Sequence, residues 1–360
     1  MPYAPPRVDL HPWMSARKPE REWTVNGWFS GALLPWYREH LRPLPWRETK
    51  DPYRVWLSEV ILQQTRVDQG MTYWRRFVER YPTVQDLAAS HEDDVLKLWQ
   101  GLGYYSRARN LRIAAGQLMN EHGGAFPTTY AELKGLKGVG EYTAAAIGSI
   151  AFGLPEPVVD GNVYRVLARV FGIDTPIDST AGRKQFRQLA ADLLDHQHPG
   201  DHNQAVMELG ATVCLPRNPA CDRCPLANKC IARKTDRIAL LPVKVGTTSV
   251  RERHFNYLHS ETPQGVFVQQ RTGKDIWQGL FELPLIESEK PLTKRAFENA
   301  LAKALGDGWK VRVRSVEVKH ILSHQIIRAV SWTVEAPKGL GSPAGWTRVP
   351  RRKLNELAVP

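Results

Sequence analysis

The chain has 360 residues, 42% of them hydrophobic, and 49 lysines and arginines against 37 aspartates and glutamates give a net charge of +12. This length predicts two domains with a core in each, and the positive charge suits a polyanionic partner such as nucleic acid. No apolar run approaches a membrane span and the N-terminus lacks the apolar core of a signal peptide, so we expect a soluble, cytoplasmic monomer without membrane contact, nucleoid-associated if bacterial.

The N-terminal part begins irregularly and then becomes helical. Residues 1–20 carry proline, arginine and lysine without periodicity, which predicts a disordered extension. A helix is predicted over 25–41, in which Pro35 either introduces a kink or marks the true start. The other helices predicted before the cysteine-containing segment cover 55–67, 87–99, 106–121, 141–152, 162–170, 181–196 and 203–213.

Glu59 is an unusual residue in the helix predicted over 55–67, because the surrounding positions are mostly apolar. If Glu59 lies beside the apolar stripe, desolvation raises its pKa and keeps it protonated near neutrality, as a general acid requires. A solvated helix glutamate is the alternative. The sequence around Glu59 leaves both open.

A turn over 100–109 contains two glycines, two adjacent tyrosines and two arginines. Aromatic rings beside cationic side chains can wedge into a base stack while the charges hold phosphates. Paired tyrosines in a turn also commonly pack against a core, so this segment is either a wedge or a packing element.

A second glycine-rich turn, Lys137-Gly138-Val139-Gly140, joins a short helical turn over 128–133 to the helix predicted over 141–152. A tight hairpin of this kind leaves backbone N–H groups and a helix N-terminus available to a phosphate. Such contacts position a duplex without reading its sequence. A glycine-rich helix corner without a ligand is the alternative.

The cysteines form the most specific pattern in the chain. All four lie in one short segment, at Cys214, Cys221, Cys224 and Cys230. In a reducing compartment this clustering favours metal binding over disulfides. Four thiolates in tetrahedral arrangement permit either zinc or an iron-sulfur cluster.

The periodicity changes after the cysteines. Residues 236–252 are basic and irregular and predict a linker. Beyond them we predict an α+β domain over 253–360. Its predicted elements are strands over 265–270, 309–318 and 325–334 and a helix over 291–305.

In order along the chain, Glu59, the glycine hairpin, Asp160 and the four cysteines resemble the MutY-type adenine DNA glycosylases, which belong to the helix-hairpin-helix superfamily of endonuclease III. The resemblance extends from about residue 25 to the C-terminus. It implies a mostly α glycosylase domain over 21–235 with a 4Fe-4S cluster loop at 214–230. It also implies that the α+β domain over 253–360 is Nudix-like and recognises 8-oxoguanine.

The resemblance implies a monofunctional enzyme of base excision repair. Its substrate would be double-stranded DNA with adenine mispaired with 8-oxoguanine or guanine. Glu59 would protonate adenine at N7, and Asp160 would stabilise or capture the sugar cation. Tyr142 and Asn162 would support this centre. Because the two carboxyl groups need opposite protonation states, we expect Asp160, placed before a helix N-terminus, to stay ionised.

The resemblance also implies residues that contact the DNA. Positions lining the adenine pocket correspond to Trp46, Arg47 and Gln204. Positions beside 8-oxoguanine correspond to Gln64, Leu102 and Tyr104, and the recognition turn of the C-terminal domain corresponds to Leu322, Ser323 and His324, with Leu322 where the family usually has phenylalanine. The resemblance implies that the DNA phosphates are contacted by the backbone of Lys137, Gly138, Val139 and Gly140.

Two features distinguish the MutY-type resemblance from a resemblance to endonuclease III and from a hydrolytic Nudix enzyme. Endonuclease III carries a lysine at the position of Tyr142, so no amine is placed here for Schiff-base chemistry. A hydrolytic Nudix domain needs a carboxylate-rich magnesium-binding helix, and none follows Gly279, so we expect recognition without hydrolysis. A DNA-binding module with idle carboxylates is the alternative from another functional class.

Overall fold

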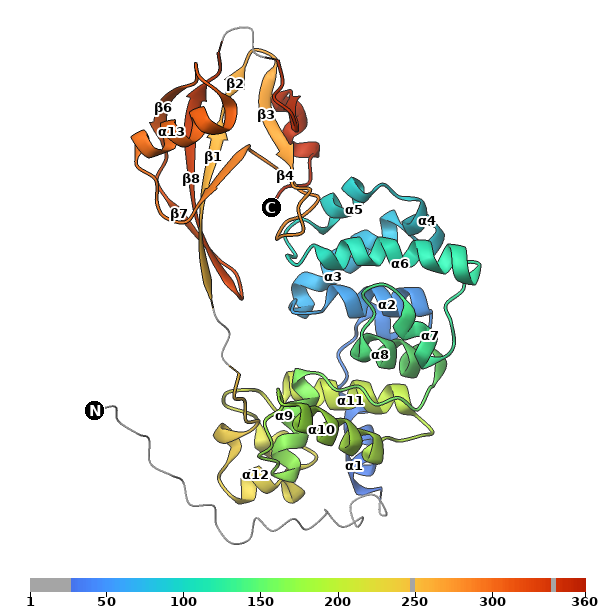
Figure 1. The fold of residues 1–360 in the computed structure, drawn as a ribbon. Coiled ribbons are helices and arrows are strands. Elements are labelled where there is room, and N and C mark those ends of the chain that lie inside the picture. The colour runs from blue at the N-terminus through green and yellow to red at the C-terminus, as the bar shows by residue number, and fades with distance from the viewer. Residues whose placement is uncertain (1–26, 247–249, 338–340) are drawn as a thin grey trace, which may run out of the picture. The chain divides into compact units, whose positions relative to one another are not determined.

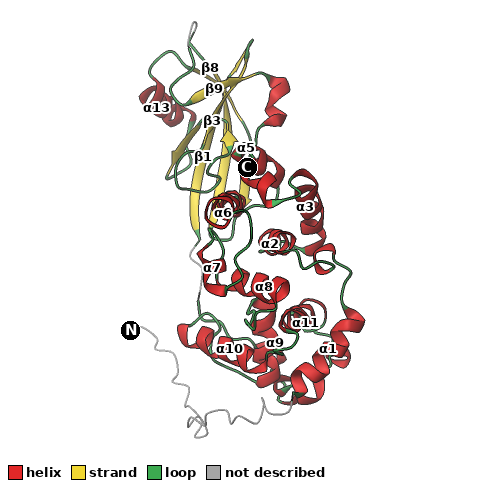
Figure 2. Ribbon diagram, turned by 90° about the vertical axis from the view of Figure 1, so that its right-hand side faces the viewer, coloured by secondary structure: helices red, strands yellow, loops and turns green. Residues whose placement is uncertain are grey.

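The computed structural model describes residues 27–246, 250–337 and 341–360. The chain divides into two units, each built from distant segments (Figures 1 and 2). The first unit joins residues 27–42 to 155–244, and the second joins 43–154 to 245–360. The extension predicted over 1–20 lies outside the described residues, as does part of the predicted linker.

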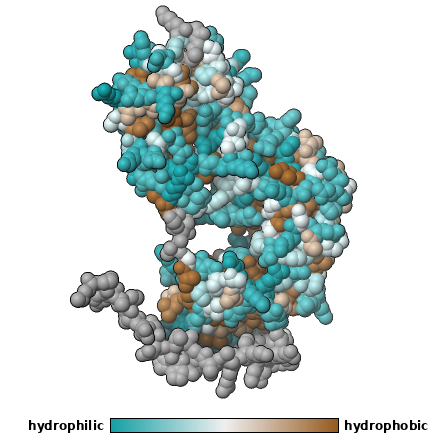
Figure 3. Space-filling model, viewed as in Figure 1, coloured by the Kyte–Doolittle hydropathy of each residue, from teal (hydrophilic) through white to brown (hydrophobic). Residues whose placement is uncertain are grey.

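Hydrophilic residues cover most of the face shown in Figure 3. In the part of the chain that the structure describes, no helix is long and apolar enough to cross a membrane. The large apolar side chains gather instead in buried clusters within each unit.

The first unit is a bundle of helices around α9 (Gly161–Phe171). Helices α10 (Thr180–Leu193), α11 (Pro199–Thr212) and α12 (Ile231–Lys234) pack against α9, and α1 (Trp28–His40) packs against α11. Three short 3-10 turns, η4 (Cys221–Arg223), η5 (Ala227–Lys229) and η6 (Ile238–Leu240), complete it. Its core includes Phe29, Leu33, Val166, Phe186 and Leu209.

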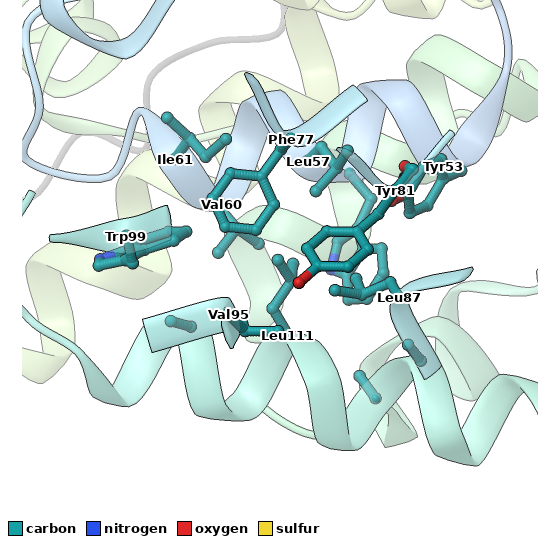
Figure 4. Close-up of a cluster of buried hydrophobic side chains, with 14 of the residues drawn as sticks. Tyr53, Leu57, Val60, Ile61, Phe77, Tyr81, Leu87, Val95, Trp99 and Leu111 are labelled. Carbon is teal, nitrogen blue, oxygen red and sulfur yellow. The ribbon is translucent and has the colours of Figure 1, made fainter. Parts of the chain in front are cut away.

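The helical part of the second unit contains a 3-10 turn, η3 (Pro45–Arg47), followed by α2 (Pro52–Ile61), α3 (Val67–Arg80), α4 (Val84–Ala89), α5 (Glu92–Trp99), α6 (Ser106–His122), α7 (Tyr130–Gly135) and α8 (Glu141–Phe152). Helix α2 packs against α3, α6 and α8. Figure 4 shows part of the core between these helices, where Leu57, Phe77 and Trp99 are fully buried. The packing of α2 against α8 brings the helix that carries Glu59 beside the helix that carries Tyr142.

Most predicted helices are confirmed, although α10 ends at Leu193 instead of 196 and α11 begins at Pro199 instead of 203. Two further predictions are wrong in extent. Helix α8 has the predicted bounds. The helix predicted over 55–67 ends at Ile61, because the carbonyls of Val60, Ile61 and Gln63 accept hydrogen bonds from a buried arginine side chain. The helix predicted over 87–99 is two helices, and the Ser90 hydroxyl bonds the Leu87 carbonyl where α4 ends.

Two sheets form the rest of the second unit. Within the described residues, one sheet contains β1 (Arg251–His259), β5 (Leu285–Ser288), β6 (Lys310–Arg314), β7 (Val318–Ile321) and β8 (Gln325–Glu335). The other contains β2 (Glu261–Thr262), β3 (Gly265–Gln270), β4 (Phe281–Glu282) and β9 (Trp346–Val349). Strands β1 and β8 are parallel, and the remaining pairs are antiparallel.

Helix α13 (Lys294–Leu305) covers the first sheet, with the ring of Phe297 stacked 4.4 Å from that of Trp332. A 3-10 turn, η7 (Arg351–Glu356), lies near the C-terminus. The prediction for β3 is confirmed, whereas the strand predicted over 309–318 breaks after Arg314, so that β6 and β7 pair separately with β8. Strand β1 begins at Arg251, inside the segment predicted as a linker.

Candidate active site and cysteine loop

Glu59 lies on α2, half-buried, and accepts a hydrogen bond from the hydroxyl of Tyr142 at 2.6 Å. Tyr142 is in the first turn of α8, directly after the glycine hairpin. The neighbours of Glu59 along α2, Ser58 and Val60, are both buried. The phenol therefore fixes the orientation of the carboxyl group at the edge of the core.

Two residues predicted to line an adenine pocket belong to the same unit. Trp46 is buried in η3, and its ring lies 5.7 Å from that of Trp74. Arg47 follows it and is half-buried. The turn η3 packs against α2, so both residues lie on an element adjoining the helix of Glu59.

The glycine hairpin between α7 and α8 adopts a tight turn. Gly138 has a φ of 77°, and a Cβ there would lie 2.6 Å from the Cβ of Asn110. The N–H of Lys137 donates to Gln117 and that of Val139 to the Leu136 carbonyl, so these two amides are already used within the protein. Gly138 and Gly140 are exposed, and they remain the predicted phosphate contacts.

The side chains predicted to lie beside 8-oxoguanine come from two turns and a hairpin of the second unit. Gln64 is exposed in the turn after α2, and Tyr104, 43% exposed, stands in the turn before α6. Leu102 is buried in the core. The hydroxyl of Tyr104 lies 2.6 Å from that of Ser323, in the turn between β7 and β8. Tyr104, Ser323 and His324 share the lining of a cavity of about 770 Å³.

Asp160 is the N-cap of α9 in the first unit. Its carboxylate accepts hydrogen bonds from the N–H of Val163 at 2.7 Å and from the side-chain amide of Asn162 at 2.8 Å. These donors favour the ionised form, as the helix N-terminus predicts. Burial has the larger effect and raises the pKa of Asp160 above its ordinary value. The direction therefore differs from that expected from the helix alone, because the sequence does not show how deeply protein atoms enclose the carboxyl group.

Arg165 connects Asn162 to the start of the cysteine loop. Its Nη2 donates to Asn162 Oδ1 at 2.8 Å and to the Gly210 carbonyl at 2.7 Å, and its Nε donates to the Cys214 carbonyl at 2.7 Å. A Cβ at Gly210 would lie 2.5 Å from that of Asn162, so only glycine lets α11 approach this closely. Gln204, predicted in the adenine pocket, is half-buried on the same helix.

The four cysteines line one small cavity, together with apolar side chains of α9 and α11. Arg169, which is buried, places Nη1 3.5 Å from the sulfur of Cys214. Among the described residues, no three potential ligands converge as they would around a single metal ion. In a 4Fe-4S cluster each of the four thiolates binds a separate iron, so the cysteine sulfurs do not meet at one metal ion. Four cysteines around an apolar cavity with a buried cation fit an anionic cluster of this kind.

Two arginines have structural roles that no sequence pattern indicated. Arg165 holds Asn162, and Arg107 donates hydrogen bonds to carbonyls at the end of α2 and in the turn after it. Both contacts join segments far apart in the chain. The only sequence signal is an arginine in a helix whose neighbours are largely apolar.

Two family models match this chain. Residues 57–192 match the HhH-GPD superfamily base excision DNA repair protein, and residues 257–360 match the NUDIX domain. A solved thermostable thymine-DNA glycosylase is 29% identical, with a TM-score of 0.54 over 57% of this chain and 95% of its own. An endonuclease III–DNA complex, at 22% identity and a TM-score of 0.50, has the same helical fold over 58% of this chain and 96% of its own. The predicted fold, helical and then Nudix-like, is confirmed.

Curated relatives narrow the family further. The adenine DNA glycosylase of Homo sapiens is 48% identical over 215 residues, 57% of this chain. That of Rattus norvegicus is 44% identical over 240 residues, 63% of this chain. The chain spans 39% and 46% of the lengths of these two proteins. The adenine DNA glycosylase of Buchnera aphidicola subsp. Schizaphis graminum is 35% identical over 262 residues, 72% of this chain and 76% of the relative. The chain therefore belongs to the adenine DNA glycosylase family, as the resemblance predicted.

Proposed function

We propose that the protein is a monofunctional adenine DNA glycosylase that acts as a monomer on double-stranded DNA. It would hydrolyse the N-glycosidic bond of adenine mispaired with 8-oxoguanine or guanine, with excision in residues 21–235 and recognition in 253–360. The observation that carries the proposal is a pair of carboxyl groups, each held in one orientation by hydrogen-bond donors of the protein. Glu59 is bonded to a phenol, and Asp160 is bonded to N–H donors.

Glu59 supplies the acid in this proposal. Adenine leaves poorly as an anion, so its ring must gain a proton while the N-glycosidic bond breaks. The Tyr142 hydroxyl, 2.6 Å from Glu59 Oε2, holds the carboxyl group in one orientation. Trp46 and Arg47, on the element beside the helix of Glu59, would bind the base.

Asp160 acts on the sugar. Positive charge develops there as the bond breaks, and a carboxylate stabilises it most effectively where water is scarce. The Val163 N–H and the Asn162 amide offset part of the cost of burying this charge. Asn162 is therefore a supporting residue of the reaction.

Extrusion of the nucleotide precedes the chemistry. Unstacking a base from a duplex costs a few kcal/mol and less at a mismatch. Gln64 and Tyr104 would fill the space beside 8-oxoguanine, and the exposed glycines of the hairpin would hold a phosphate. The net charge of +12 would add non-specific attraction to DNA.

We also propose that Cys214, Cys221, Cys224 and Cys230 bind a 4Fe-4S cluster. When bound, the cluster cross-links the loop and adds its binding energy to folding. The loop adjoins α9, whose N-terminus carries Asp160, so a folded loop supports the position of that carboxylate.

The wild-type protein is expected to release adenine from an 8-oxoguanine:A duplex without forming a Schiff base, because a tyrosine occupies the position of the endonuclease III lysine. The measurement is adenine release by chromatography, with sodium borohydride trapping of the protein on the same duplex. Endonuclease III is the positive control for trapping. Trapping as efficient as that of endonuclease III, or no adenine release, contradicts the proposal.

Replacing Ser323 and His324 together with alanine is expected to reduce the preference for 8-oxoguanine:A over G:A about tenfold, because two hydrogen-bonding side chains are lost. Both side chains line the same cavity as Tyr104. Single-turnover rates on the two duplexes give the preference, and Ser342→Ala, at an exposed serine, is the matched control. An unchanged preference in the double variant removes the recognition role from this turn.

A further inference from the structure

Arginine side chains mostly lie at the protein surface, but that of Arg107 is buried and donates hydrogen bonds to several backbone carbonyls. It lies in the first turn of α6, and only 9% of it is exposed. Its Nη1 donates to the carbonyls of Val60, Ile61 and Gln63 at 2.9, 3.0 and 2.6 Å. Its Nη2 lies 3.3 and 3.2 Å from the carbonyls of Leu102 and Gly103. One guanidinium therefore joins two turns more than 30 residues apart.

Each of these two turns presents one residue in a strained backbone conformation. Gln64 has a φ of 58° and Tyr104 a φ of 46°, in the left-handed region that residues other than glycine rarely adopt. Both side chains are exposed. Strained residues persist where their surroundings hold them, and they concentrate at functional sites.

The location of Arg107 is electrostatically unfavourable in itself. A cation in the first turn of a helix opposes the helix dipole, and burial lowers the pKa of Arg107 to about 10. The contacts that offset this cost are the five carbonyls and the ring of Trp99, 4.9 Å from the guanidinium carbon. Lysine has a single ammonium group and cannot reach both turns with a planar fork of donors.

We propose that Arg107 is a positioning residue for 8-oxoguanine discrimination, which holds Gln64 and Tyr104 in the geometry that meets the lesion. This inference rests on the proposed function and adds a residue to it. Arg107 itself touches no DNA in this scheme.

The position of Tyr104 is also tied to the recognition turn. Its hydroxyl lies 2.6 Å from Ser323 Oγ, and its ring centroid lies 5.8 Å from the guanidinium carbon of Arg107. A shift of the 100–105 turn would therefore move Tyr104 away from Ser323. The loss of Arg107 would therefore affect the contacts of Tyr104 with the lesion and those of the turn that contains Ser323. Arg107 itself makes neither set of contacts.

The test compares Arg107→Lys with Leu111→Ala in the full-length protein. Leu111 is buried on the same helix and makes none of the side-chain hydrogen bonds to the two turns, so its truncation destabilises the core and leaves those bonds in place. Single-turnover adenine release is measured on 8-oxoguanine:A and G:A duplexes and referred to the folded, active fraction. Because displacement of the catalytic carboxyl groups slows both substrates, the ratio of the two rates isolates the contacts with the lesion.

Arg107→Lys is expected to lower this ratio about tenfold, since small misplacements of positioning groups cost an order of magnitude or more. Leu111→Ala is expected to keep the wild-type ratio. In a Gln64→Ala/Tyr104→Ala background, the ratio is already low, and Arg107→Lys should change it by less than about twofold.

Three results overturn the inference while the proposed function stands. One is an unchanged ratio in Arg107→Lys. Another is an equal fall of the ratio in Leu111→Ala, which makes the effect one of general stability. The third is an undiminished effect of Arg107→Lys in the double-alanine background, which shows that the arginine acts elsewhere. A wild-type protein that releases no adenine from either duplex overturns the proposed function, and this inference with it.

Discussion

Replacing Asp160 with asparagine is expected to lower the rate of adenine release at least about a thousandfold while DNA binding is retained. Asparagine has nearly the same shape as aspartate but carries no charge to stabilise the sugar cation. The measurement is the single-turnover rate on an 8-oxoguanine:A duplex, together with the affinity for the same duplex over a range of salt concentrations.

The choice of asparagine separates chemistry from folding. Asp160 caps α9, and asparagine is about as good an N-cap as aspartate, whereas Asp160→Ala removes the cap and costs about 1 kcal/mol of stability. Asp160→Asn should therefore unfold at nearly the wild-type temperature. A variant that binds DNA and releases adenine at the wild-type rate would show that the Asp160 carboxylate takes no part in the reaction. A DNA-binding module, by contrast, would release no adenine even as the wild type.

Replacing Glu59 with glutamine is expected to reduce adenine release roughly a hundred- to ten-thousandfold, the range that general acid catalysis contributes. The amide oxygen of glutamine can still accept the Tyr142 hydroxyl, so the side chain keeps its place, but it has no acidic proton to transfer. Single-turnover rates on the 8-oxoguanine:A duplex test this, with circular dichroism to confirm that the helices are intact.

Tyr142→Phe is the matched control for Glu59→Gln. It removes the hydrogen bond to Oε2 and leaves the acid, so its rate should fall less than that of Glu59→Gln. If Glu59→Gln releases adenine as fast as the wild type, the proton reaches the base by another route. If Tyr142→Phe is the slower of the two, the phenol and not the carboxyl group is the main contributor.

Local patterns in the sequence determined the elements whose signals lie within a short segment. Helix α8 follows from an alanine-rich run after a glycine turn, and β3 from a short β-branched run. The order of Glu59, the glycine hairpin, Asp160 and the four cysteines was enough to identify the family. These predictions hold in the folded protein because they depend on neighbours in the chain and on chemistry that few residue types can perform.

Only the tertiary structure decided how particular side chains are held. The end of α2 at Ile61 depends on Arg107, which lies more than 40 residues further along the chain. The hydrogen bond from Tyr142 to Glu59 spans 83 positions. The raised pKa of Asp160 depends on burial, which opposes the local effect of the helix N-terminus. Hydrogen-bond partners and desolvation are set by groups that folding brings together, and no local pattern in the chain encodes them.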